Sequence, residues 1–193
     1  MQIIAHRRNT IEQLRATPYE YGVEIDLRSS NGKIILNHEP FEDGVEIHEW
    51  LRHYKHKFVI LNVKEEGIEN SVKNIMDSNG IKDYFFLDLS FPALVRMVSS
   101  KEKRIAVRFS EYEPIQLAGA FKGDVEWVWV DCFTKMPLTK PTHDILSRYF
   151  KICLVSPEIQ GHGPEMIAEF KKALKRFRID AVCTKHPEMW KIK

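Results

Sequence analysis

The sequence alternates short apolar runs with segments of amphipathic helical pattern along its whole length. The runs at residues 58–63 and 84–87 are apolar almost throughout, which is typical of parallel strands buried on both faces. The segments between the runs place apolar residues three and four positions apart, as a helix with one buried face does. The pattern predicts strands at residues 3–5, 23–27, 33–36, 58–63, 84–87, 105–109, 127–130, 152–155 and 179–183.

A series of about eight covered strands alternating with helices predicts an α/β fold, a compact (β/α)8 TIM barrel. The chain has 193 residues, against a typical ~250 for this architecture, so we expect short loops. We see no linker, repeat or low-complexity segment, and we predict a single domain over residues 1–193. An open, doubly wound sheet has the same order of strands and helices and is the alternative.

The composition limits the classes of partner. The chain is 44% hydrophobic and 29% charged, which suits one domain with a sizeable core. Its net charge is only +2, and the lysines and arginines are spread along the chain, so we expect neither nucleic acid nor a membrane surface as partner. No apolar run approaches the ~20 residues of a membrane span, and no signal peptide is apparent. We therefore expect a cytoplasmic protein, with its three cysteines as reduced core thiols.

The strand at residues 23–27 carries charge on one of its faces. Val23, Ile25 and Leu27 alternate with Glu24 and Asp26, so both carboxylates point to the same side. Burying an unpaired carboxylate costs several kcal/mol, and a bound cation would remove that cost. A solvated edge strand is the alternative. The turn at residues 31–32 and the short run at 33–36 then return the chain, so that His38 can approach the carboxylates.

An ordered set of short motifs extends over almost the whole chain. It consists of His6-Arg7, Asn9-Thr10, Glu24-x-Asp26, Asn31-Gly32, His38 with Pro40, Leu61-Asn62-Val63-Lys64, Ser90-Phe91-Pro92 and Thr184-x-x-Pro187. With these motifs the sequence resembles the glycerophosphodiester phosphodiesterase family, within the phosphatidylinositol-phospholipase-C-like superfamily. The resemblance implies a phosphoric diester hydrolase of lipid metabolism that acts on a small-molecule phosphodiester.

The resemblance also implies roles for individual residues. His6 and His38 match the general acid and base, and imidazole suits this task because its pKa lies near neutrality. Glu24 and Asp26 match metal ligands, and we expect a divalent cation, magnesium or calcium, with manganese as an alternative. Arg7 and Lys64 would stabilise the negative charge of the phosphate. The metal, the two alcohol groups and the oligomeric state stay open.

Three positions depart from the family pattern. Arg8 replaces a glycine and Lys185 replaces an aspartate. Asn62 stands where the resemblance places a carboxylate as third metal ligand. We therefore expect Asn62 to ligate the metal through its amide oxygen, with Asp131 from a later strand end as a further ligand.

Polar residues also follow the later strands, where barrel enzymes form their active sites. Ser156 and Glu158 lie in a polar loop at a position where barrels often bind phosphate, and we predict that they contact the substrate phosphate. A simple turn is the alternative for this loop.

Two other functions fit the same residues less completely. The altered third ligand would suit a catalytically altered barrel that binds a phosphorylated metabolite or a partner. Barrels also host metal-dependent sugar isomerases and aldolases. The joint presence of Glu24, Asp26, His6, His38 and Lys64 favours the phosphodiesterase.

Overall fold

The computed structural model describes residues 1–191, and the chain forms two compact units. Unit 1 comprises residues 1–4 and the chain from residue 101 onward, and unit 2 comprises residues 5–100. The single domain expected over residues 1–193 stays a prediction.

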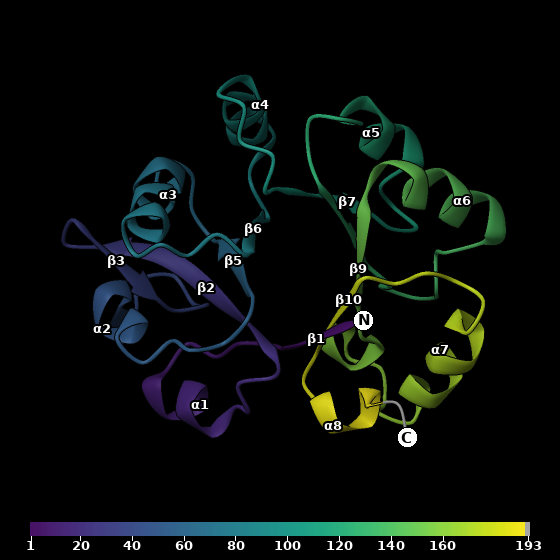
Figure 1. Ribbon diagram of the computed structural model, residues 1–193, viewed down its shortest axis with the longest axis horizontal. Coiled ribbons are helices and arrows are strands. Elements are labelled where there is room, and N and C mark those ends of the chain that lie inside the picture. The colour runs from purple at the N-terminus through teal and green to yellow at the C-terminus, as the bar shows by residue number, and fades with distance from the viewer. Residues whose placement is uncertain (192–193) are drawn as a thin grey trace. The chain divides into compact units, whose positions relative to one another are not determined.

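Unit 2 is organised around the long strand β2 (Gly22–Ser30) (Figure 1). Its first half pairs in parallel with β5 (Val59–Val63), which pairs in parallel with β6 (Tyr84–Leu87). Its second half pairs antiparallel with β3 (Lys33–Leu36), which in turn pairs with the short β4 (Val45–Glu46). Strand β2 therefore leaves its parallel neighbour and continues as a hairpin.

The hairpin turn has a local cause. Asn31 and Gly32 form the two-residue loop between β2 and β3, and both have positive φ angles, 51° and 76°. This is the conformation that a two-residue turn with the correct twist requires, and Asn-Gly is the sequence that adopts it most readily. The predicted turn is confirmed, and it determines where the segment with His38 begins.

The helices of unit 2 cover its strands. They are α1 (Ile11–Ala16), α2 (Ile47–Leu51), α3 (Glu69–Ser78) and α4 (Phe91–Ser99). Thr10 caps α1, and Thr10 and Gln13 form a reciprocal capping box, while the Ser90 side chain caps α4. The indole of Trp50 is fully buried and donates a hydrogen bond of 2.9 Å to the carbonyl of Arg8. This bond fixes the chain that leads from the first strand into α1.

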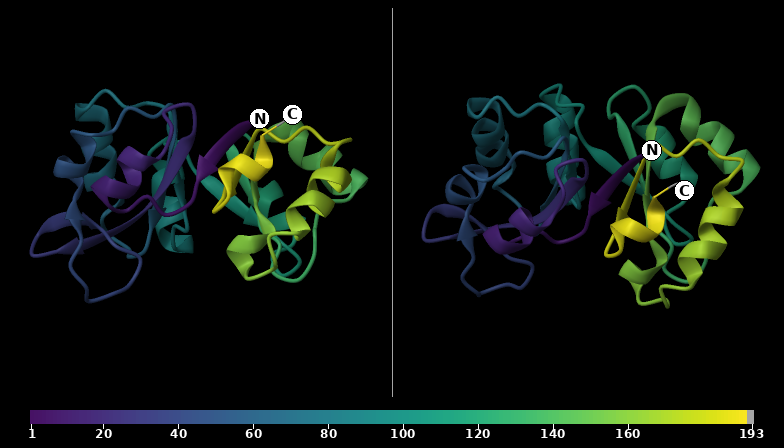
Figure 2. Two further views of the ribbon diagram at one scale, coloured as in Figure 1. Left: turned by 90° about the horizontal axis from the view of Figure 1, so that it is seen from below. Right: turned by 60° about the horizontal axis from the view of Figure 1, so that its bottom comes forward.

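Unit 1 contains the first residues of β1 (Gln2–Ala5) together with the later strands. In strand order β1 is followed by β10 (Ala181–Thr184), β9 (Lys151–Val155), β8 (Trp127–Val130) and β7 (Ala106–Phe109). Strands β7 to β10 are all parallel. The helices are α5 (Ile115–Ala120), α6 (Lys140–Tyr149), the 3-10 helix η1 (Pro157–Gln160), α7 (Met166–Leu174) and α8 (Pro187–Trp190). Figures 1 and 2 show α5, α6 and α7 along the strands of this unit.

The observed elements confirm the predicted alternation of strands and helices. Strands β3, β6 and β8 have the predicted bounds. The prediction missed η1 and α8, because each is a four-residue helix that begins with proline and shows no helical period. The three cysteines are buried and free, as expected. Within residues 1–191, no helix combines the length and the apolar character that crossing a bilayer requires.

Candidate active site

In unit 2 the neighbouring strands β2 and β5 bring together Glu24, Asp26 and Asn62, three of the four predicted metal ligands. Glu24 and Asp26 are both fully buried on β2, although each is charged at neutral pH in water. The alternative of a solvated edge strand is therefore wrong for this part of β2, because β5 pairs with residues 23–27 and both faces of this part are buried. The two carboxylates must be compensated within the protein.

Asn62 lies directly beside Asp26 in the register of β2 and β5. Its amide nitrogen donates a hydrogen bond of 2.9 Å to Glu24 Oε1. This bond directs the Asn62 carbonyl oxygen away from the carboxylate. Among the described residues, that Oδ1 and Asp26 Oδ1 are buried and accept no hydrogen bond. Such oxygens are costly to bury, and a cation would compensate both of them.

Asp26 is held by a residue whose contact the sequence did not reveal. Asn9 donates from Nδ2 to Asp26 Oδ2, and it accepts from the Asp26 backbone nitrogen through Oδ1, both at 2.9 Å. These bonds occupy Asp26 Oδ2 and leave Oδ1 toward Lys64, whose ammonium lies 3.5 Å away. The sequence signal for Asn9 is its place in the Asn9-Thr10 motif, which by itself does not indicate a contact with Asp26.

His6 and Arg7 lie next to the carboxylates, as predicted. The Arg7 backbone nitrogen donates a hydrogen bond of 2.7 Å to Glu24 Oε2, and His6 Nε2 lies 3.8 Å from the same oxygen. Arg7 has a φ of 50°, a left-handed conformation that is uncommon for a residue with a side chain. Its guanidinium Nε lies 3.7 Å from Asp26 Oδ2, and the side chain is 45% exposed. The charge of Arg7 is therefore accessible to a ligand.

Lys64 connects two carboxylates at the end of β5. Its ammonium lies 3.3 Å from Asp88 Oδ2 in addition to its contact with Asp26. Asp88 directly follows β6 and, like Arg7, has a positive φ, of 58°. Lys64 is thus placed at the border between the buried carboxylates and the surface, with its side chain 18% exposed.

The surroundings of Glu24 change its acidity. Burial, and next the negative charge of Asp26, raise the pKa of Glu24 to about 7, while the hydrogen bonds from Asn62 and from the Arg7 backbone oppose part of the rise. Near neutral pH the site therefore favours either a proton on Glu24 or a cation beside it.

The group offers two carboxylates and one amide as oxygen ligands. Within residues 1–191, no three His, Cys, Asp or Glu side chains come together as a metal-binding cluster. The two buried oxygens without hydrogen bonds, on Asp26 and Asn62, nevertheless fit a hard divalent cation, which prefers oxygen ligands. The residues present are compatible with the predicted metal, with a lower ligand charge than three carboxylates would give.

His38 follows the hairpin formed by β2 and β3. Its Nδ1 lies 2.6 Å from Glu39 Oε1, and its side chain is 34% exposed. The Arg28 guanidinium donates two hydrogen bonds to the His38 carbonyl oxygen. The imidazole thus has one nitrogen paired and its backbone held.

The other predicted site residues belong to unit 1 and have internal partners there. Asp131 is almost fully buried, and its carboxylate accepts hydrogen bonds from Arg108, Gln160, Trp129 and the Cys132 backbone nitrogen. Burial raises the pKa of Asp131, while the Arg108 charge opposes part of that rise. Its role as metal ligand stays a prediction, and these four donors favour a structural one.

Ser156 and Glu158 form a buried network with the end of β10. Ser156 donates to the Glu158 carboxylate and accepts a hydrogen bond of 2.8 Å from Trp190 Nε1. Glu158 also accepts from the Thr184 hydroxyl at 2.6 Å and from the Lys185 backbone nitrogen at 2.9 Å. The predicted contact of Ser156 and Glu158 with phosphate is not tested by this geometry, but their polar atoms are already engaged.

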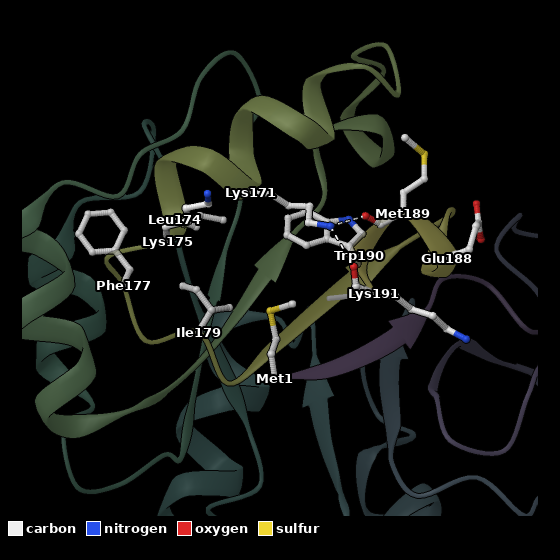
Figure 3. A pocket seen from close by; sticks show the side chains of 10 residues that line it. All are labelled: Met1, Lys171, Leu174, Lys175, Phe177, Ile179, Glu188, Met189, Trp190 and Lys191. Carbon is white, nitrogen blue, oxygen red and sulfur yellow. Dashed lines mark hydrogen bonds between the residues drawn. The ribbon is translucent and has the colours of Figure 1, made fainter. Parts of the chain in front are cut away.

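Two cavities differ in their relation to these residues. A hollow of about 450 Å³ in unit 2 is lined by Asn9, which holds Asp26, and by Asn37, which precedes His38. A larger cavity of about 880 Å³ in unit 1 lies among Leu174, Trp190 and Lys171, and Figure 3 shows Lys171 donating to backbone carbonyls near the end of α8. None of the predicted site residues lines either cavity. The smaller hollow is connected to the buried carboxylates through Asn9, whose side chain donates a hydrogen bond to Asp26.

Comparison with solved structures identifies the architecture. The chain is similar to a glycerophosphodiester phosphodiesterase from Agrobacterium tumefaciens, with a TM-score of 0.73 and 14% identity over 98% of both chains. The fold is a (β/α)8 TIM barrel. A glycerophosphoryl diester phosphodiesterase from Parabacteroides distasonis matches with a TM-score of 0.66 and 14% identity, covering 97% of this chain and 84% of the other. The TIM-barrel prediction is confirmed, and the open doubly wound sheet is wrong.

The TIM barrel also relates the chain to a protein of different function. A chain of the tryptophan synthase a2b2 complex from Pyrococcus furiosus matches with a TM-score of 0.57 and 14% identity, over 97% of this chain and 88% of that one. No sequence-family model matches the chain, and no characterised protein matches it by sequence. At such identities the likeness establishes the fold, and function has to be argued from the site.

Proposed function

We propose that the protein is a metal-dependent phosphoric diester hydrolase that acts on a small phosphodiester. One observation carries the proposal: Glu24, Asp26 and Asn62 are buried side by side, and two of their oxygens accept no hydrogen bond among the described residues. Proteins with the same fold include two glycerophosphodiester phosphodiesterases, which supports the choice of a phosphodiester as substrate.

Glu24, Asp26 and Asn62 would hold the cation, which we propose to be magnesium or calcium, with manganese as an alternative. When bound, such a cation supplies Lewis-acid stabilisation of negative charge on phosphate oxygens. Asn9 supports this set by fixing one oxygen of Asp26, and the Arg7 backbone nitrogen fixes one oxygen of Glu24. Together with the bond from Asn62 to Glu24, these bonds leave Asp26 Oδ1 as the carboxylate oxygen of this pair that accepts no hydrogen bond among the described residues.

Arg7 and Lys64 would bind the phosphate group. Both cations already lie within 4 Å of Asp26, at 3.7 Å for Arg7 and 3.5 Å for Lys64. A phosphodiester carries a negative charge that grows toward the transition state, and fixed cations in a poorly hydrated site stabilise that increase. Asp88 would hold the Lys64 ammonium toward the surface, where the substrate arrives.

His6 and His38 would exchange the protons. One imidazole takes a proton from the attacking hydroxyl group, and the other gives a proton to the leaving alcohol oxygen. The attacking group is a hydroxyl next to the phosphoester when the substrate has one, which yields a cyclic phosphate, and otherwise it is water. The contact between His38 Nδ1 and Glu39 would leave Nε2 as the nitrogen that faces the substrate.

The test is hydrolysis of bis(p-nitrophenyl) phosphate by the purified protein with magnesium, calcium or manganese, compared with protein treated with a chelator. We expect metal-dependent release of p-nitrophenol that Asp26→Asn abolishes. Activity that is equal with and without chelator, or equal in Asp26→Asn, would contradict the proposal.

A catalytically altered barrel that binds a phosphorylated metabolite is the second candidate, and the presence of Asn62 favours it. In that case the protein would bind a phosphate monoester in the presence of metal and turn over no diester. A sugar isomerase or aldolase is supported by no contact in the site. A cytoplasmic location stays a prediction.

A further inference from the structure

Arg28 lies where β2 leaves its parallel neighbour and enters the hairpin. Its side chain is partly buried and bridges two backbone carbonyls that are far apart in the sequence. Nε and Nη2 donate to the His38 carbonyl oxygen at 3.1 and 2.9 Å, and Nη1 donates to the Lys64 carbonyl oxygen at 3.2 Å. One guanidinium thus joins the residue at the end of the hairpin to the residue at the end of β5.

Arg28 attaches the hairpin to the end of β5, in addition to the hydrogen bond from Ser29 to Glu65. Beyond Leu27, β2 pairs with β3, and β3 pairs with the two-residue β4. Small antiparallel ribbons of this kind have little stability of their own in water. The other side-chain hydrogen bonds described for residues 37–39 stay within residues 37–43. These local bonds shape the loop but do not attach it to β5.

The backbone of Lys64 is also hydrogen-bonded to β2. Its backbone nitrogen donates a hydrogen bond of 3.0 Å to the Leu27 carbonyl, one residue before Arg28. The Arg28 bond to the Lys64 carbonyl continues this attachment by one more peptide group. Both backbone groups of Lys64 are therefore fixed to β2, and so is the carbonyl of His38.

From this geometry we propose that Arg28 is a positioning residue that sets the distance between His38 and Lys64. The inference rests on the proposed function, in which His38 exchanges a proton and Lys64 binds the phosphate. Arg28 acts through the backbone of both residues. Arginine is required because its planar fork donates in several fixed directions, whereas the single ammonium of lysine does not reproduce this pattern.

Proton transfer depends strongly on the distance between the reacting groups, so a displaced His38 should lower the rate. A misplacement of about 1 Å of a catalytic group costs on the order of 10²-fold in rate. We expect Arg28→Ala and Arg28→Lys to lower kcat about 10- to 100-fold, with a smaller change of KM. We expect added ethylguanidinium to restore part of the kcat of Arg28→Ala but none of that of Arg28→Lys, whose side chain fills the space.

Hydrogen–deuterium exchange provides a measurement that does not depend on activity. In Arg28→Ala we expect faster exchange at residues 37–44 and 64–66, with unchanged exchange in β6. Arg96→Ala is the matched control, because Arg96 also donates to an acceptor in the loop after β5, Glu66, and its described hydrogen bond and ion pair involve no hairpin residue. If Arg28→Ala fails to fold, Arg28→Lys carries the same comparison.

The outcomes separate the two proposals. Faster exchange together with guanidinium rescue supports the positioning role. Wild-type turnover with wild-type exchange in Arg28→Ala overturns it, and so does a loss of turnover with unchanged exchange and no rescue. If the wild-type protein hydrolyses no phosphodiester, the proposed function fails. The exchange of residues 37–44 then decides alone whether Arg28 orders the segment.

Discussion

The Asn62 amide nitrogen donates a hydrogen bond of 2.9 Å to Glu24 Oε1, while the carbonyl oxygen of the same side chain is buried without a donor among the described residues. Asn62 thus neutralises part of one carboxylate and presents an oxygen ligand at the same time. An aspartate at this position would remove the donor and add a third negative charge. The amide lets the carboxylate pair stay buried without a metal, and it weakens the attraction for the cation.

The raised pKa of Glu24 predicts a pH-dependent stability of the metal-free protein. In the folded state its pKa is about 7, against 4.5 as the reference value. The folded protein therefore retains a proton that the unfolded chain releases. This contribution is fully present below about pH 4.5 and is lost as the pH rises through 7, and it amounts to a few kcal/mol in total.

Urea unfolding at pH 5 and pH 8 with a chelator tests this linkage. From pH 5 to pH 8 we expect the free energy of unfolding to decrease more in the wild type than in Glu24→Gln, because glutamine cannot titrate at this position. A difference between wild type and Glu24→Gln that does not change with pH would show that Glu24 titrates normally.

The catalytic roles of His6 and His38 can be tested one at a time. We expect His6→Ala and His38→Ala each to lower phosphodiesterase turnover ~10²- to 10⁴-fold, because each removes a positioned acid or base. Both should retain the circular dichroism spectrum and the melting temperature of the wild type within a few degrees. The exposed His48 on α2 provides the control, since His48→Ala should change neither. Near-normal turnover in either variant removes that histidine from the mechanism.

Lys64 is predicted to act on the substrate rather than on the metal. We expect Lys64→Ala to lower kcat/KM about 10²-fold, as the loss of one charge-stabilising group typically does. Metal affinity should stay the same or increase, because a cation beside Asp26 is removed. Lys73→Ala, which removes a surface ion pair with Asp77, is the control. Loss of the metal in Lys64→Ala would mean that the lysine organises the metal site.

Substitution of Ser156 distinguishes a structural role of its loop from a role in binding phosphate. If the buried network is structural, Ser156→Ala leaves Trp190 Nε1 and one Glu158 oxygen without a partner, which costs about 1–3 kcal/mol of stability. KM for the substrate should then stay near the wild-type value. A several-fold higher KM at unchanged stability would instead support the sequence-based prediction that this loop binds phosphate.

The sequence was informative wherever a local pattern determines structure. Apolar runs predicted the strands, Asn31-Gly32 predicted the hairpin turn, and the spacing of Glu24 and Asp26 placed both carboxylates on one face of β2. It was less informative about which side chains meet across distant segments. The bond of Asn9 to Asp26 joins residues 17 positions apart, and the bonds of Arg28 reach backbone carbonyls whose positions depend on the fold.

The polar loop after β9 is a second case in which the sequence does not reveal the tertiary contacts. A serine and a glutamate after a barrel strand have the composition of a phosphate-binding loop. Only the fold shows that Trp190, Thr184 and the Lys185 backbone reach these groups. Arg108 and Gln160 likewise engage Asp131 from different segments of unit 1. Such compensation of buried charge requires tertiary contacts that no local pattern encodes.

The central claim, that Glu24, Asp26 and Asn62 form a weak cation site, is tested most directly by a magnesium titration without substrate. Isothermal calorimetry on the wild type, Asn62→Asp, Asp26→Asn and Asp131→Asn should show weak binding by the wild type and none by Asp26→Asn. Asn62→Asp should bind at least about tenfold more tightly, because it adds a carboxylate to the ligand set. Asp131→Asn should bind like the wild type. If Asn62→Asp binds no more tightly and Asp131→Asn loses the metal, then Asp131 is the third ligand and the assignment of Asn62 is wrong.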